Sequence, residues 1–260
     1  MRRLPLAAAT TVLLLAVAGC AAAAEPHASD PSEAADSDAK PLAGRTITVD
    51  PGHNGGNADH PEIVDEPVDA GTHEKSCDTT GTETDDGYAE HEFNFDVATR
   101  LADLLRDAGA DVVLTRDSDD GVGPCFSERA EIANEAGSDA AVNIHADGGP
   151  DDEGGFHIIT PREIDGLTDD VAETSHDLAV DVRDAYRDGV EEIPPADYIG
   201  DDGINVRDDM GGLNLSEVPK VLAECGNMRN ADDAALLSDP DVRQQIAEAL
   251  ADGLTRFLLE

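Results

Sequence analysis

Three residues that can bind a metal or move a proton stand where short apolar segments of the sequence end. His53, His145 and Glu224 each follow or close a Val-, Ile- or Ala-rich segment of the kind that forms a buried strand. Ligands of open α/β sheets bind beyond the carboxyl ends of the strands, so these side chains are expected to lie near one another. A hydrolytic zinc uses about three protein ligands and keeps one position for water. The residue types and their places therefore predict a metal site.

The third ligand is predicted at the start of a helix. Glu90, His91 and Glu92 precede an apolar stripe that contains Phe93 and Val97. Glu90 lies three residues before Phe93 and so shares the core-facing side of the helix, whereas Glu92 falls on the polar side. We therefore expect Glu90 to point toward the sheet and bind the metal. The alternative is that Glu90 only caps the helix, since carboxylates are favoured at helix N-termini.

Strand alternation separates Glu224 from its neighbour. If Glu224 faces the site, Cys225 must face the opposite side of the sheet, so Cys225 is not counted as a ligand. The alternative interpretation pairs Glu224 with a buried arginine such as Arg116 or Arg129.

Strand and helix patterns alternate from residue 43 to residue 260. The predicted strands are 46–50, 111–115, 140–145, 156–159 and 220–224, and the predicted helices are 93–108, 127–136, 169–187, 232–237 and 240–258. This order predicts one α/β domain with a mostly parallel twisted sheet covered by helices on both faces. The segment 55–88 is too long for a simple connector. It is expected either to wall or gate the site or to be a solvated insertion.

The first 42 residues are predicted to lie outside this domain. Arg2 and Arg3 precede an apolar run, and Gly19-Cys20 follows it, as in a bacterial lipoprotein signal. We expect removal of residues 1–19, a lipid on Cys20, and an acidic disordered tether over 20–42 that leaves the domain anchored outside the cytoplasmic membrane. The alternative is an ordinary secretory signal with a chance cysteine.

Cysteine usage fits an exported protein, in which disulfides form. Cys77 and Cys125 lie in loop-like segments and are predicted to pair, whereas Cys225 ends an apolar strand and is expected to be a free buried thiol.

The chain is strongly acidic, with 17 Lys and Arg against 58 Asp and Glu and a net charge of −41. This balance excludes nucleic acid as a partner, because binding phosphates needs basic residues. It would also repel anionic polymers of other kinds. A surface rich in Asp and nearly free of Lys predicts adaptation to concentrated salt, with compositional drift as the alternative.

Four motifs occur in order between about Arg45 and the C-terminus. They are Asp50-Pro51-Gly52-His53-Asn54-Gly55, Glu90 before a helix, Asn143-Ile144-His145-Ala146-Asp147 and Glu224-Cys225-Gly226-Asn227. Together they resemble the motifs of the zinc-dependent N-acetylmuramoyl-L-alanine amidases of the type-3 class. The mycobacterial-like branch is the most similar, because its members also resemble the chain at Gly123-Pro124-Cys125, Ala146-Asp147-Gly148-Gly149-Pro150, Gly212-Leu213-Asn214-Leu215 and Gly226-Asn227-Met228. The sequence departs from the family pattern after Gly226: many members have an aromatic residue there, whereas Asn227 and Met228 follow in this chain.

The resemblance implies that His53, Glu90 and His145 bind Zn²⁺ and that Glu224 is catalytic. The implied reaction is cleavage of the amide between N-acetylmuramic acid and L-alanine in peptidoglycan or muropeptides, and the branch also implies the Cys77–Cys125 bridge.

Two further residues are expected to contact the substrate. The protein is expected to act as a monomer. Asn54 lies beside His53, and Arg207 either pairs with a stem-peptide carboxylate or with a neighbouring acid. The alternative functions are another zinc hydrolase of wall peptides, such as a carboxypeptidase, and a non-catalytic lipoprotein that binds wall fragments.

Overall fold

The computed structural model describes residues 40–260. The predicted signal peptide, the lipidation site Cys20 and most of the predicted tether lie outside the described residues. Leu42, at the end of the predicted tether, is fully buried, and its backbone N–H donates to the carbonyl of Ala108. The folded domain therefore includes Leu42.

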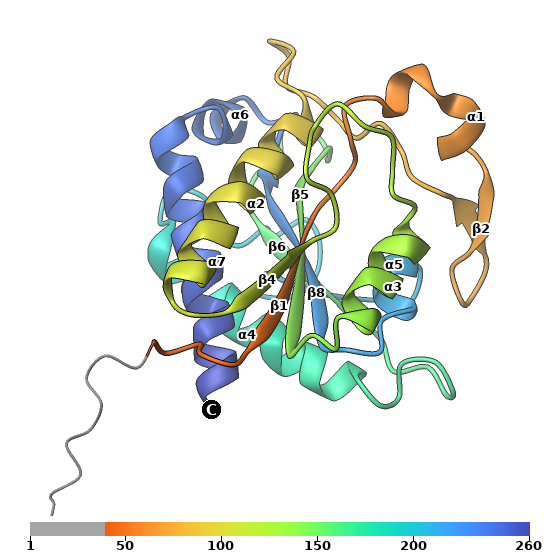
Figure 1. Ribbon diagram of the computed structural model, residues 1–260. Coiled ribbons are helices and arrows are strands. Elements are labelled where there is room, and N and C mark those ends of the chain that lie inside the picture. The colour runs from red at the N-terminus through yellow and green to blue at the C-terminus, as the bar shows by residue number, and fades with distance from the viewer. Residues whose placement is uncertain (1–39) are drawn as a thin grey trace, which may run out of the picture. The chain divides into compact units, whose positions relative to one another are not determined.

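A six-stranded sheet forms the centre of the domain, in the order β4-β1-β5-β8-β6-β7 (Figure 1). Its strands are β1 (Thr46–Pro51), β4 (Asp111–Leu114), β5 (Ala140–Asp147), β6 (His157–Pro161), β7 (Ile204–Arg207) and β8 (Lys220–Asn227). Every neighbouring pair is parallel except β6 and β8, which run antiparallel. The prediction of a mostly parallel sheet is confirmed.

Helices cover both faces of this sheet. The helices are α1 (Pro61–Val64), α2 (Glu90–Asp107), α3 (Phe126–Glu135), α4 (Ala172–Gly189), α5 (Gly211–Asn214), α6 (Ala231–Leu237) and α7 (Pro240–Leu259). Figure 1 shows α2 and α7 on one side of the strands and α3 and α5 on the other, and α4 packs against α7 in the first layer. The main apolar core lies between the sheet and this first layer.

The alternation of side chains along the strands sorts apolar from polar groups. Ile144 on β5 and Ala223 on β8 belong to the main core. Their neighbours His145 and Glu224 therefore face the opposite side, toward α3 and α5. Asp50 on β1 faces the same way, because it pairs with Arg129 of α3. The polar side chains of Asp50, His145 and Glu224 thus lie on one face of the sheet, near the carboxyl ends of three adjacent strands.

Helix α2 forms because its apolar residues recur every three or four positions. Phe93, Val97, Leu101 and Leu105 are all fully buried. The helix stops at Gly109, whose φ of +101° lies in the region that favours glycine. This arrangement fixes the first turn of α2, and with it Glu90, above the carboxyl ends of β1 and β5.

Several short elements were not predicted. They are β7, the two-stranded antiparallel ribbon of β2 (Pro67–Asp69) and β3 (Glu74–Ser76), the single-turn helices α1 and α5, and a 3₁₀ turn at Asn57–Asp59. Each has only three or four residues, too few for an apolar period to show.

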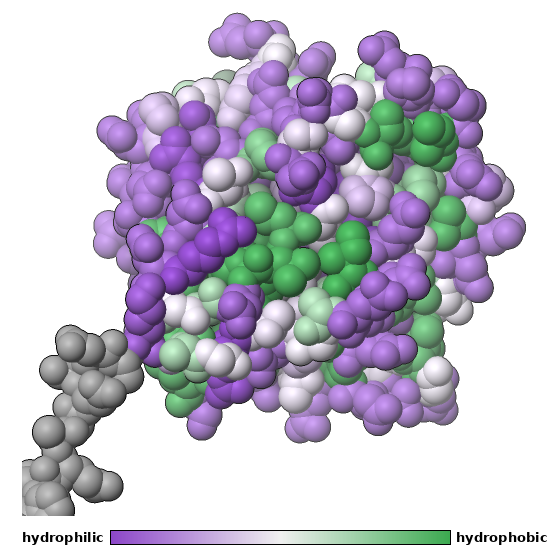
Figure 2. Space-filling model, in the orientation of Figure 1, coloured by the Kyte–Doolittle hydropathy of each residue, from purple (hydrophilic) through white to green (hydrophobic). Residues whose placement is uncertain are grey.

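Hydrophilic side chains cover most of the face seen in Figure 2, and apolar groups show at its centre, over the region between α2 and α3. The edge strand β4 runs there, and its residues Val112–Leu114 are half-buried. Within residues 40–260, no helix has the length and apolar character needed to cross a bilayer.

Candidate metal centre and cleft

His53, Glu90 and His145 converge at the carboxyl edge of the sheet. One potential ligand atom from each lies within 4.8 Å of the others. The Oε1 atom of Glu90 is 3.3 Å from Nε2 of His53 and 2.8 Å from Nδ1 of His145. The three residues come from the end of β1, the start of α2 and the end of β5. Two imidazoles and one carboxylate form a donor set of the kind that binds a catalytic zinc.

The backbone at His53 is held in an uncommon conformation. Its φ is +56°, a strained value for a residue with a Cβ, and such strain is concentrated at functional sites. Position 52 must be glycine because the His145 ring lies so close to its backbone that a Cβ would collide with the ring. Nδ1 of His53 lies 3.0 Å from Oδ1 of Asp78 and 3.1 Å from the carbonyl of Thr79. These contacts leave Nε2 directed at the centre.

His145 is held from its other side by a residue of the same strand. Its Nε2 lies 3.0 Å from Oδ1 of Asn143, and Nδ2 of Asn143 donates to the carbonyl of Asp50 at 2.8 Å. Asn143 faces the site because it is two residues from His145 on β5. Partners of this kind orient the ring of a metal-binding histidine.

Glu90 is buried and faces the histidines as predicted. Its Oε2 accepts a hydrogen bond from the backbone N–H of Thr82 at 2.9 Å, so the carboxylate is not used to cap its own helix. Burial alone would raise the pKa of Glu90, but the two imidazoles outweigh it and hold the pKa well below the usual value. Burial lowers the pKa of His53, yet Glu90 and Asp78 raise it to about 10.

Glu224 lies beside His145, because the two residues are paired in the parallel register of β5 and β8. Its Oε2 is buried and has no hydrogen-bond partner among the described residues. Burial, followed by the charges of Glu90 and Asp147, raises its pKa well above the usual value. Cys225 is free and buried in the main core on the other face.

The alternative interpretation, in which Glu224 pairs with Arg116 or Arg129, is wrong. Arg129 pairs with Asp50 at 2.8 Å and with Asp78 at 3.2 Å, and Arg116 pairs with Asp119 at 2.9 Å. The carboxylate of Glu224 therefore remains available to react within the cleft.

A buried charge network supports the centre from below, and the sequence did not reveal it. Asp50 binds Arg129 at 2.8 Å and Lys220 at 3.1 Å and accepts a hydrogen bond from Thr115 at 2.6 Å. All four side chains are buried. The signal in the sequence was a lysine at the start of an apolar strand, since Lys is almost never fully buried unless paired.

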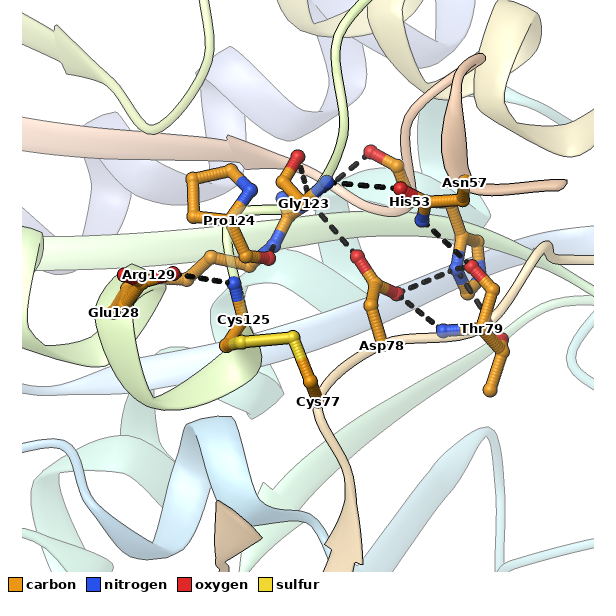
Figure 3. Close-up of a disulfide and its surroundings, with 10 residues drawn as sticks. All are labelled: His53, Asn57, Cys77, Asp78, Thr79, Gly123, Pro124, Cys125, Glu128 and Arg129. Atoms are coloured by element: carbon orange, nitrogen blue, oxygen red, sulfur yellow. Dashed lines mark hydrogen bonds and ion pairs between the residues drawn. A yellow bond between two sulfur atoms is a disulfide. The ribbon is translucent and has the colours of Figure 1, made fainter. Parts of the chain in front are cut away.

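A disulfide joins Cys77 and Cys125, the predicted pair. Figure 3 shows that Asp78, the next residue, reaches His53 on one side and Arg129 on the other. The disulfide thus ties the loop that carries Asp78 to the start of α3. This link makes the bridge part of the support of His53 in the candidate metal centre.

Both residues predicted to bind substrate are engaged within the protein. Nδ2 of Asn54 donates to the carbonyl of Gly123 at 2.9 Å, and its Oδ1 accepts from the backbone N–H of Gly121 at 3.1 Å. Arg207 forms two hydrogen bonds with Asp209, at 2.8 and 2.6 Å. For Arg207 this is the alternative that the sequence left open. The contacts of Asn54 and Arg207 therefore give no support to a role in substrate binding.

A cleft of about 360 Å³ opens beside the cluster. His53, Glu90, His145 and Glu224 form part of its lining. Residues 75–79 and 210–213 form other parts of its wall. The long 55–88 segment therefore walls the site, which is one of the two roles expected for it.

Comparisons with known proteins agree with this geometry. The profile of the family described as N-acetylmuramoyl-L-alanine amidase matches residues 47–256. N-acetylmuramoyl-L-alanine amidase Rv3717 of Mycobacterium tuberculosis is 38% identical over 219 residues, or 84% of this chain and 88% of that protein.

Solved structures show the same similarity. The crystal structure of the N-acetylmuramyl-L-alanine amidase Ami1 from Mycobacterium smegmatis gives a TM-score of 0.78 at 40% identity, covering 84% of this chain and 98% of that one. Ami1 from Mycobacterium abscessus gives 0.78 at 39% identity, covering 84% of this chain and all of that one (100%).

Proposed function

The chain belongs to the N-acetylmuramoyl-L-alanine amidase family, in its mycobacterial-like branch, and we propose that it hydrolyses the amide between N-acetylmuramic acid and L-alanine at the cleft described above. The substrates are peptidoglycan and its soluble muropeptides. The observation that carries the proposal is the convergence of His53, Glu90 and His145 beside Glu224, whose Oε2 has no hydrogen-bond partner among the described residues.

The donor set fits Zn²⁺. His53 and His145 would supply two nitrogens and Glu90 one oxygen, while Asp78 and Asn143 orient the two rings from behind. When bound, zinc polarises the amide carbonyl and lowers the pKa of water. The three side chains line the cleft, where a substrate carbonyl can approach.

Glu224 would move the protons of the reaction. Its carboxylate accepts a proton from the attacking water and delivers it to the nitrogen of the departing L-alanine, which leaves as an amine. A raised pKa suits this role, because the group must hold a proton between the two steps. Positioned proton transfer of this kind contributes roughly 10²–10⁴ in rate.

The identity of the products tests the proposed reaction. Purified murein is digested with the protein, and the fragments are identified by mass spectrometry. We expect free stem peptides with an N-terminal L-alanine, loss of activity on chelation and its return with added Zn²⁺. Removal of C-terminal D-alanine instead would identify a carboxypeptidase, and the absence of any cleavage would leave only a binding protein.

We also propose that the protein is exported and is anchored to the membrane by a lipid on Cys20, which lies outside the described residues. A short tether before Leu42 would then hold the catalytic domain near the wall. Labelling with a fatty acid in the native host should mark the protein and not a Cys20→Ala variant. An unlabelled protein released into the medium would contradict the anchor.

A further inference from the structure

Within residues 40–260, almost all of the basic side chains of this acidic protein are paired with nearby carboxylates. Every arginine in residues 40–260 has a nitrogen within 4.0 Å of a carboxylate oxygen, and Lys220 is paired with Asp50. Within the same residues, Lys40 and Lys75 have no such partner. In a chain with 58 acids and 17 bases, an unpaired ammonium is an exception that calls for a cause.

The two unpaired lysines occupy very different places. Nζ of Lys40 donates to the carbonyl of Arg106 at the exposed end of α2. Lys75 is half-buried on β3, and its side chain forms part of the wall of the cleft. Its one hydrogen bond goes to the backbone carbonyl of Asp209 at 3.1 Å, and an ammonium has three donors. Within the described residues, Lys75 therefore presents unused donors and an ammonium with no carboxylate oxygen within 4.0 Å beside the substrate site.

The nearby carboxylate of Asp209 is already taken. Arg207 binds both of its oxygens, at 2.8 and 2.6 Å, so Asp209 is not the partner of Lys75. The guanidinium of Arg129, which does line the cleft, is paired with Asp50 and Asp78. Among the lysines and arginines that line the cleft, only Lys75 is left to bind an anion.

The distance between Lys75 and the candidate metal centre suits a carboxylate that lies on the stem peptide close to the scissile bond. Lys75 and Asp78 are three residues apart, which limits the separation of their Cα atoms to about 10 Å, and Asp78 contacts His53. A carboxylate on the second residue of a stem peptide lies about 7 Å along the chain from the bond that is cut, since each extended residue spans up to about 3.6 Å. A lysine side chain can span the remaining distance.

We infer that Lys75 binds a carboxylate of the stem peptide and makes the amidase select acidic peptides, a role that presupposes the proposed reaction. Acidic side chains, such as that of Asp147, also line the cleft, and negative charge there disfavours an anionic peptide. Lys75 offsets this repulsion at one position and so fixes the orientation of the peptide as well as its affinity.

The test compares two substrates that differ only in charge. They are N-acetylmuramoyl-L-alanyl-D-glutamate and the same compound with both carboxylates amidated. For the wild type we expect a KM about tenfold lower for the acid than for the amide, because a hydrogen bond to a charged group contributes about 1.5 kcal/mol or more. Lys75→Met should raise the KM for the acid to that for the amide and leave kcat within about twofold.

Two further variants serve as controls. Lys40→Met makes the same change in net charge beside the C-terminal end of α2, the end opposite Glu90, and should alter neither KM. Lys75→Arg should retain most of the preference for the acid. Equal increases in KM for both substrates would show that Lys75 only supports the loop of Asp209, and an unchanged preference would also overturn the inference. If the wild type cleaves neither compound nor murein, it is the proposed reaction that fails.

Discussion

Asp50 neutralises two buried cations beneath the metal centre. Its carboxylate binds Arg129 and Lys220, and all three side chains are nearly or fully excluded from water. Lys220 has no other carboxylate within 4.0 Å in the described part of the chain. The loss of one partner from a buried ion pair leaves a charge without compensation, which costs far more than the loss of an exposed pair.

We therefore expect Asp50→Asn to lower the free energy of unfolding by about 3–5 kcal/mol, measured by urea denaturation. Asp85→Asn, which removes the exposed partner of Arg229, is the matched control and should cost less than about 1 kcal/mol. Equal effects of the two substitutions would show that the buried network does not hold the fold.

Asp50 should also make the stability of the fold sensitive to acid. Burial tends to raise the pKa of Asp50, but Lys220 and Arg129 outweigh it and hold the pKa well below its usual value. Because the folded pKa is the lower one, the contribution of Asp50 to stability is complete above the unfolded pKa of about 3.9. It is lost as the pH falls below that value.

Urea denaturation between pH 6 and pH 2 measures this contribution. The wild type should lose stability more steeply below about pH 4 than Asp50→Asn, which has no proton to take up at this position. Parallel curves for the two proteins would contradict a depressed pKa at Asp50.

At the scale of the elements, the disulfide joins two segments that both serve the metal centre. Cys77 precedes Asp78, which contacts His53, and Cys125 precedes α3, which carries Arg129. The bridge closes a loop with a sequence separation of 48 residues, so its removal increases the conformational freedom of the unfolded chain. Removal of the bridge also frees the segment that contains Asp78 and orients the ring of His53.

The double variant Cys77→Ser/Cys125→Ser should be less stable by about 2–4 kcal/mol and should bind Zn²⁺ about 10–100-fold more weakly. Thermal unfolding and metal titration give the two quantities. Cys225→Ala removes the free buried thiol and should leave zinc affinity unchanged. A double variant that binds Zn²⁺ with the wild-type affinity would show that the disulfide does not support zinc binding.

The elements that carry the metal centre could be predicted because their apolar periods are long enough to see. The strands of His53, His145 and Glu224 and the helix of Glu90 all occur close to their expected bounds. The ribbon of β2 and β3, β7 and α5 could not be predicted, since they are short and depend on contacts with distant segments. β7, for example, exists through its pairing with β6.

The same distinction applies to the site. Glu90 was placed by helical geometry alone, whereas the role of Asp78 depends on a loop whose path is set by the disulfide. Asn143 could have been found, because it is two residues before His145 on a predicted strand. Lys75 could not, since its importance depends on which acids Arg207 and Arg129 occupy.

At the scale of the whole molecule, the excess of acids remains the dominant feature. Most of the face seen in Figure 2 is hydrophilic, and a net charge of −41 repels itself across the surface. Salt shortens the reach of this repulsion, from about 10 Å at 0.1 M to about 3 Å at 1 M. The compact state should therefore gain stability in concentrated salt.

Melting curves in 0.1 M and 1 M KCl test this effect. We expect the midpoint to rise by at least about 3 °C, which for a domain of this size corresponds to roughly 1 kcal/mol. A chloride salt is suitable because strongly excluded anions such as sulfate stabilise proteins for other reasons. A midpoint that does not rise would favour compositional drift over adaptation to salt.

The most direct test of the amidase site compares zinc content with turnover in two matched variants. Glu224→Gln should retain as much zinc per molecule as the wild type while its rate of muropeptide cleavage falls by about 10²–10⁴. Glu90→Gln, an identical change 134 positions earlier in the chain, should lose both the metal and the activity. Cleavage at the wild-type rate by Glu224→Gln, or full activity in protein that contains no metal, would contradict the assignment of the four residues.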